Sequence, residues 1–206
     1  MSEPGPRPST LTTASRTRTV RGVRSAIGAT LVASVAASMA CNRAPAGPDV
    51  AALVSQLKSA DPEARGKASL AIIPVGEPAV PGLVEMLKSE DPQYRATAAS
   101  TLFGMGAKAR AAVPALAEAL SDPGPEMRAS VAMALESIGP DAAPAVPALV
   151  RALKDREGLV RQRAAIALGS IGPGAREALP ALNEASRVDL VRPAAEEAIR
   201  KITTPR

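Results

Sequence analysis

The stretch VPALVRALKDREGLVRQRAAIALGSIG, residues 146–172, holds two short amphipathic segments that are separated by a polar turn and closed by a glycine. Close variants of its opening recur along the chain, as VPGLVEMLK at 80–88, VPALAEAL at 113–120 and LPAL at 179–182. The first residues of these copies, Val80, Val113, Val146 and Leu179, stand 33 positions apart. A fixed period of this length is typical of repeat architectures, in which each unit packs on the next.

Aligning the copies gives five units, at 49–79, 80–112, 113–145, 146–178 and 179–206, of which the first lacks three residues after Gly76. Each unit is predicted to form two helices. In the first helix, leucines recur four residues apart in units one to four, so they share one face. Units two to five place a proline near the start of this helix, where its missing N–H breaks no hydrogen bond: Pro81, Pro114, Pro147 and Pro180.

The second helix of every unit carries an apolar stripe at positions i, i+4, i+8 and i+11. The stripe comprises Ala64, Ala68, Ile72 and Val75; Tyr94, Ala98, Leu102 and Met105; Met127, Val131, Leu135 and Ile138; Val160, Ala164, Leu168 and Ile171; and Val191, Ala195, Ile199 and Ile202. Gly76, Gly106, Gly139 and Gly172 come directly after it, and each is expected to end its helix in the left-handed conformation. The pattern predicts an all-α solenoid, a superhelix of five two-helix repeats around an alanine-rich core.

Three segments carry a more specific resemblance: DPQYRATAASTLFGMG, DPGPEMRASVAMALESIG and DREGLVRQRAAIALGSIG, each followed by VPAL or a close variant. They resemble the HEAT-like repeats named after phycobilisome lyases, and the resemblance spans residues 49–203. It implies a superhelix of helix pairs with a concave binding surface. Ankyrin repeats have the same period, but their T-P-L-H signature is absent from this chain, which contains no histidine.

The beginning of the chain has the character of an export signal. VRSAIGATLVASVAASMAC, residues 23–41, joins an arginine-bearing segment to an apolar stretch and small residues before the single cysteine. We expect residues 1–40 to be a leader, Cys41 to be the lipidated residue of a bacterial lipoprotein, and 41–48 to be a tether. Ser38 and Ala40 also fit an ordinary cleavage site, so plain secretion stays open, as do an uncleaved anchor and a start codon downstream of Met1.

The net charge of +5 comes mainly from this leader, which contributes +4, whereas residues 41–206 contribute +1. A basic surface for DNA or RNA is therefore not expected on the repeat domain.

One arginine stands directly after the start of the stripe in all five units: Arg65, Arg95, Arg128, Arg161 and Arg192. An aspartate stands upstream in each connecting loop: Asp61, Asp91, Asp122, Asp155 and Asp189. We interpret the two sets as a structural arginine ladder that ties neighbouring units together. The alternative is a row of guanidinium groups that binds an acidic ligand or phosphates.

Catalytic and metal-binding motifs are missing from the sequence. With no histidine and one cysteine, the chain cannot assemble a Ser-His or Cys-His nucleophile, and no metal or cofactor is predicted. Chemistry by carboxylates alone stays open, although adjacent Glu196 and Glu197 fit the solvated face of the last helix better. That helix and Asn183 in the helix before it give the fifth unit the polar character of a capping repeat.

The surface expected to bind a partner lies on the second helices, three, six and ten residues past each stripe start, with Phe103 as a further member. Its candidate residues are Lys67, Leu70, Ser100, Phe103, Met133, Arg163 and Ile166. The alternative is that these side chains pack against the helix of the neighbouring unit.

These observations favour a non-enzymatic, monomeric scaffold or adaptor of the bacterial cell envelope that binds a protein or peptide on its concave face. A bilin lyase or lyase chaperone, as found among HEAT-like relatives, is the first alternative, which the export leader disfavours. An envelope enzyme that uses carboxylates alone is the second.

Overall fold

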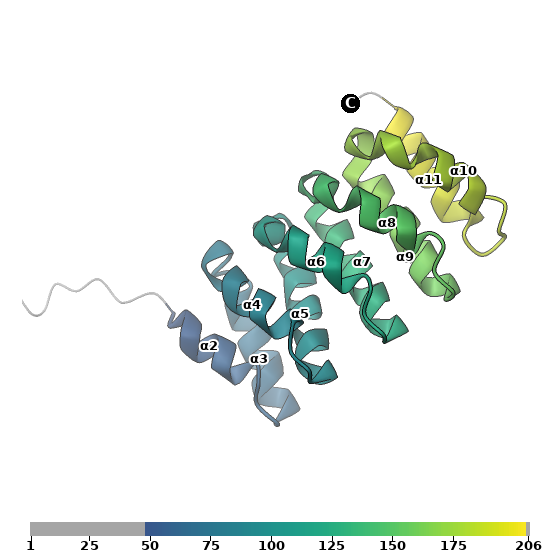
Figure 1. Cartoon of the computed structure of the whole chain (residues 1–206). Helices are drawn as coiled ribbons and strands as arrows, with labels where there is room; N and C mark the ends of the chain where they lie inside the picture. The colour runs from purple at the N-terminus through teal and green to yellow at the C-terminus, as the bar shows by residue number, and fades with distance from the viewer. Residues whose placement is uncertain (1–47, 205–206) are drawn as a thin grey trace, which may run out of the picture. The chain divides into compact units, whose positions relative to one another are not determined.

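The structure is a computed structural model that describes residues 48–204, so the predicted leader and Cys41 lie outside the described residues. Figure 1 shows a stack of helices. The elements are α2 (Val50–Gln56), α3 (Pro62–Ile72), η1 (Glu77–Ala79), α4 (Val80–Leu87), α5 (Pro92–Met105), η2 (Gly106–Ala112), α6 (Val113–Ala119), α7 (Pro125–Ile138), η3 (Gly139–Ala145), α8 (Val146–Ala152), α9 (Gly158–Ile171), η4 (Gly172–Ala178), α10 (Leu179–Ala185) and α11 (Arg192–Thr203). The predicted all-α repeat fold is confirmed.

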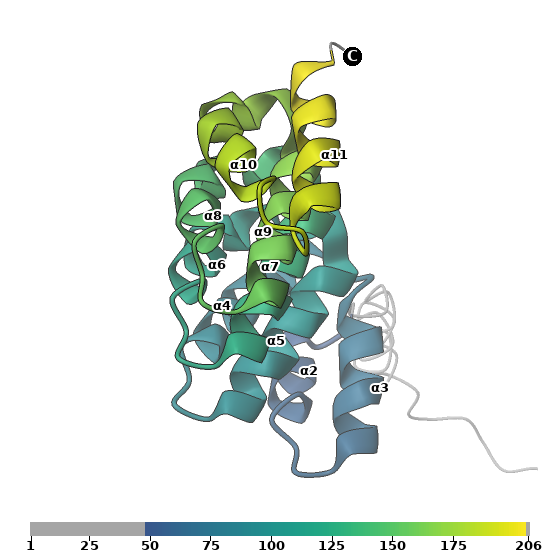
Figure 2. The ribbon, with the colours of Figure 1, turned by 90° about the vertical axis from the view of Figure 1, so that its right-hand side faces the viewer.

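The helices form two layers (Figures 1 and 2). The first helices of the units, α2, α4, α6, α8 and α10, make one layer, and the second helices, α3, α5, α7, α9 and α11, make the other. From α5 to α11, consecutive second helices pack along each other, whereas consecutive first helices touch at few points. Most of the contact between neighbouring units from α5 onward is therefore made in the layer of second helices, the layer on which the sequence predicts the concave binding surface.

Each junction between units contains a third helical piece that the two-helix description misses. Segments η1 to η4 are 3-10 turns, and η2, η3 and η4 also contact one another in sequence. In a 3-10 helix, residues three apart lie on the same side. The fully buried alanines have this spacing: Ala109 and Ala112, Ala142 and Ala145, and Ala175 and Ala178. Each junction is therefore a packed part of the core rather than a plain linker.

The four glycines that lead into the 3-10 turns adopt a conformation different from the predicted one. Gly106, Gly139 and Gly172 directly follow α5, α7 and α9, whereas Gly76 lies four residues after the end of α3. Their φ angles are positive, between 56° and 76°. Their ψ angles lie between −134° and −140°, far from the left-handed helical region, which has positive ψ. The reason is that the chain must reverse at once into the 3-10 turn. Only glycine adopts this combination readily, so the structural requirement is stricter than that of an ordinary helix end.

The predicted stripe forms the centre of one continuous core that runs through all five units. All of its members are buried except Ala64, Val75, Tyr94 and Ile199, which are half-buried and belong to the first two units and the last. Tyr94 still joins two units, because its hydroxyl donates a hydrogen bond to the carbonyl oxygen of Lys58 at 3.2 Å.

The last helix, α11, turns a polar face to solvent at the end of the stack. Glu196, Arg200 and Lys201 are exposed there, and Glu197 forms ion pairs with Arg200 and Lys201. Its buried residues, Ala195, Ala198 and Ile202, face the core. This division is what a capping repeat needs.

Candidate functional site

The candidate binding residues lie on the second helices, and the structure leaves them open to different degrees. In α3 and α5 they reach solvent: Leu70 is 73% exposed and Phe103 is 43% exposed, both high for large apolar side chains. Lys67 and Ser100 are also exposed, and Lys67 forms an ion pair with Glu63 at 2.6 Å. This part of the surface therefore offers apolar side chains beside an exposed ion pair.

In α7 and α9 the corresponding residues are partly covered. Met133, Arg163 and Ile166 are half-buried. This part of the surface is therefore less open to a partner than the part on α3 and α5. We use the term inner face for the seven candidates together: Lys67, Leu70, Ser100, Phe103, Met133, Arg163 and Ile166.

The five arginines share one local contact. Each donates to the backbone oxygen of the residue five positions before the start of its stripe, from Nη1 in units one to four and from Nε in unit five. The pairs are Arg65 and Ser59 at 2.8 Å, Arg95 and Ser89 at 2.9 Å, Arg128 and Asp122 at 2.9 Å, Arg161 and Asp155 at 2.8 Å, and Arg192 and Ser186 at 3.1 Å. The arginine thus holds the loop between the two helices of its own unit.

Only two arginines also bind an acid of the next unit within residues 48–204. Arg95 Nε lies 2.7 Å from Asp122 Oδ2. Arg128 binds Asp155 with two parallel bonds of 2.7 Å, from Nε to Oδ2 and from Nη2 to Oδ1. Fork-to-fork pairs of this kind are strong and directional. These two pairs fasten unit two to unit three and unit three to unit four.

The five-rung ladder predicted from the sequence therefore forms only at Arg95 and Arg128, whereas Arg65, Arg161 and Arg192 form no ion pair with another unit within residues 48–204. Asp122 and Asp155 stand five residues before the stripe start, where serine occupies the other units: Ser59, Ser89 and Ser186. Asp61 and Asp91 lie two residues further on and instead accept backbone N–H groups at the starts of α3 and α5. Asp189 pairs with Arg192 of its own unit. The sequence could have predicted which aspartates pair between units. Counting back five residues from the start of each stripe separates Asp122 and Asp155 from the other three aspartates.

The pKa of Asp155 is lowered, mainly by its hydrogen bonds with Arg128 and further by the backbone N–H of Glu157, while burial opposes the shift. A carboxyl whose pKa is lower in the folded state adds stability above its unfolded pKa, and that stability is lost as the pH falls through the folded value. We expect Asp155→Asn to lower the free energy of unfolding by about 2 kcal/mol at neutral pH, since Arg128 stays buried without its anion.

Urea unfolding of both proteins across the acid range measures this effect. The difference between wild type and Asp155→Asn should hold down to about pH 4, near the unfolded pKa of aspartate, and shrink below it. The control is Asp189→Asn, because Asp189 is exposed and its pair with Arg192 contributes little. A difference that does not change with pH contradicts the assignment.

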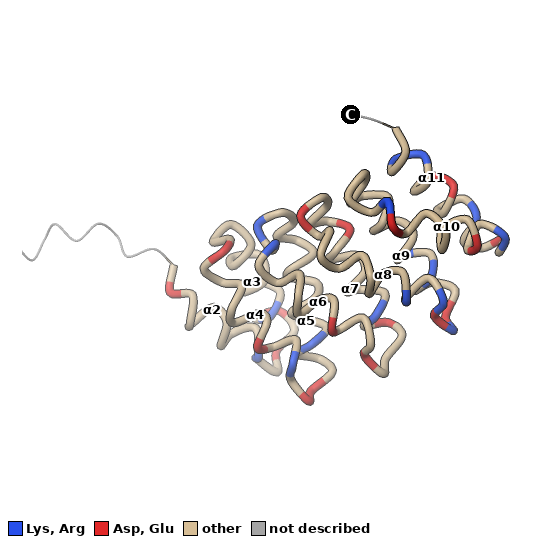
Figure 3. Tube along the Cα trace, turned by 45° about the horizontal axis from the view of Figure 1, so that its top comes forward, with Lys and Arg blue, Asp and Glu red and all other residues tan. Residues whose placement is uncertain are grey.

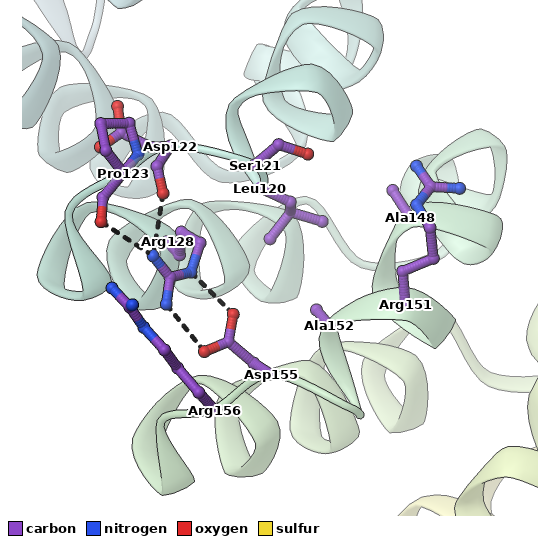
Figure 4. Close-up of a pocket in the computed structure, with 10 residues that line it drawn as sticks. All are labelled: Leu120, Ser121, Asp122, Pro123, Arg128, Ala148, Arg151, Ala152, Asp155 and Arg156. Atoms are coloured by element: carbon purple, nitrogen blue, oxygen red, sulfur yellow. Dashed lines mark hydrogen bonds and ion pairs between the residues drawn. The ribbon is translucent and has the colours of Figure 1, made fainter.

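A pocket that the sequence did not indicate opens between units three and four (Figure 4). Its volume is about 450 Å³, within the usual range for ligand sites. It is lined by Leu120, Ser121, Asp122, Pro123, Arg128, Ala148, Arg151, Ala152, Asp155 and Arg156. The pair of Arg128 and Asp155 forms part of its wall.

The sequence of the repeats matches a known protein family. The family described as HEAT repeats matches residues 50–136 and 113–200. The chain belongs to the HEAT-repeat family. No curated protein matches its sequence.

Solved structures with the same fold include natural and designed proteins. The HEAT-repeat chain is similar to the complex of CpcE and CpcF of phycocyanin lyase from Nostoc sp. PCC7120, with 22% identity, a TM-score of 0.60, and coverage of 73% of this chain and 97% of that one. It is also similar to a designed armadillo repeat protein in complex with the peptide (KR)4, with 20% identity, a TM-score of 0.58, and coverage of 73% and 80%. At these identities the likeness establishes the fold alone.

Figure 3 shows acidic and basic residues interspersed along the HEAT-repeat stack. Within residues 48–204, no three histidine, cysteine or acidic side chains gather in a way that could hold a metal ion. No helix in this part of the chain is long and apolar enough to cross a membrane.

Proposed function

We propose that this HEAT-repeat chain is a non-enzymatic, protein-binding scaffold of the bacterial cell envelope, and that its inner face holds the partner. The observation that carries the proposal is the exposure of Leu70 and Phe103 on adjacent second helices. Large apolar side chains that remain in water on one surface favour a site of protein contact. Stacked helical repeats commonly present their concave surfaces to partners.

The inner face suits a peptide or protein better than a small molecule. Its exposed members alternate between apolar groups, Leu70 and Phe103, and polar groups, Lys67 and Ser100, on an open surface. The partner it fits has an apolar segment that would cover Leu70 and Phe103.

The envelope location rests on the sequence of the leader. The apolar stretch that ends in small residues before Cys41 supports export followed by attachment of a lipid to that cysteine. Residues 42–48 then supply a short tether between the anchor and α2. We further propose that the protein acts as a monomer.

Crosslinking in intact cells, followed by extraction from membranes and mass spectrometry, tests the proposal. The N-terminal peptide of the protein is read in the same run. We expect a diacylated Cys41 and one envelope protein in stoichiometric amount. An unmodified N-terminus in the soluble fraction contradicts the anchor. A chain that purifies with a bound chromophore and no protein partner contradicts the scaffold and points to a lyase-related role.

A further inference from the structure

We propose that the pocket between units three and four is a second binding site, separate from the inner face, and that it takes an acidic peptide segment. The pocket lies where the first helices end and the loops lead into the second helices. Of the residues that line it, Leu120, Ala148 and Ala152 are buried, and we call them its floor; Arg151 and Arg156 are exposed, and we call them its rim. Neither the inner face nor the proposed partner there accounts for these arginines.

The two carboxylates that line the pocket are already occupied by the protein. Asp155 binds Arg128 through both oxygens and also accepts the N–H of Glu157 at 2.9 Å. Asp122 binds Arg95 and accepts the N–H of Gly124 at 2.8 Å. These acids are therefore not free to neutralise the rim.

The rim arginines, in contrast, have few carboxylates near them among the described residues. Arg151 is exposed and forms no ion pair with residues 48–204. Arg156 comes within 4.0 Å of its neighbour Glu157, and both of those side chains are largely exposed. Figure 4 shows Arg151 and Arg156 toward opposite ends of the view, with Arg128 and Asp155 between them. A ligand with two spaced carboxylates fits this arrangement better than one small anion does.

Comparison between the units shows that the positive charge of Arg151 is unusual at its position in the repeat. The same position in units two, three and five carries glutamate: Glu85, Glu118 and Glu184. The equivalent pocket one unit earlier is lined by Lys88 and Glu118, so its charges are mixed, and its volume is smaller, at about 240 Å³. Because glutamate stands at this position in three sister units, the fold does not require arginine at 151.

The chemistry of the site is set by these groups. A guanidinium group binds a carboxylate through two N–H groups in one plane, and its stem can lie along apolar surface. A peptide that alternates acidic and apolar residues matches the rim with its carboxylates and the floor with its apolar side chains.

Fluorescence anisotropy of the full chain with a labelled peptide of alternating Leu and Glu residues tests the proposal. The Arg151→Glu variant, which copies the sister units, should weaken binding about tenfold, since it places like charges together. The matched control is Arg176→Glu, an equal change of net charge at an exposed site in η4, outside the residues that line the pocket. It should bind like wild type.

A second peptide with Gln in place of Glu should not bind, and added salt should weaken binding of the acidic peptide. Equal affinity of Arg151→Glu and Arg176→Glu for the acidic peptide overturns the site, as does absence of binding by wild type. Displacement of the peptide by inorganic phosphate at equal anion concentration overturns the peptide assignment in favour of a small-anion site.

Discussion

Replacing Leu135 with aspartate is expected to unfold more than one repeat. Leu135 lies in α7, its exposed fraction is 0%, and α7 packs along both α5 and α9. The substitution removes a core side chain and buries a carboxylate with no partner, which together cost more than about 4 kcal/mol. Since the stability of a domain is about 5–15 kcal/mol, most of the stack should be lost at moderate temperature.

A thermal melt monitored by circular dichroism measures the loss. The matched control is Leu70→Asp, the same substitution on the second helix of unit one at a side chain that is 73% exposed. We expect it to change the free energy of unfolding by less than about 0.5 kcal/mol. A Leu135→Asp protein that melts like wild type would show that the units do not share one core.

Removing unit five together with nearly all of η4, by ending the chain after Gly172, is expected to cause aggregation. Helix α11 packs along α9, with Gly169 of α9 against Ala198 of α11, and the deletion uncovers this side of α9. An internal repeat exposed in this way presents a continuous apolar face to water.

Size-exclusion chromatography with light scattering distinguishes the outcomes. A chain that ends at Thr204 serves as the control, because it keeps α10 and α11 complete. It should elute as a monomer, whereas the chain that ends at Gly172 should form large particles or precipitate. A soluble monomer from the shorter chain would be incompatible with a capping role for unit five.

The sequence predicted the repeat, the helix pairs and the core because those features depend on side-chain periodicity. The stripe from Ala64 to Ile202 needs only helical geometry to be recognised, and nearly all of it is buried. The 3-10 turns were missed because seven residues with alanine at every third position also fit an irregular linker. The glycine conformation was missed because φ and ψ at Gly106 depend on the segment after it, and the sequence does not show that a 3-10 turn begins at once.

The candidate sites were predicted less completely, because they depend on contacts between units. The arginines were found, but which acid each one meets depends on the loop register, so Asp61, Asp91 and Asp189 were misassigned. The pocket at Arg151 was missed since it needs residues from two units. Comparing that position with Glu85, Glu118 and Glu184 would have revealed its unusual charge.

The measurement that tests the scaffold most directly is site-specific photo-crosslinking in the cells that make the protein. A photoreactive residue is placed at Phe103, on the inner face, and in a second strain at Glu85, an exposed position on first helix α4. We predict that position 103 crosslinks one envelope protein and that position 85 does not crosslink that protein. A crosslink of equal yield at both positions, or none at position 103, would contradict the assignment of the inner face as the partner site.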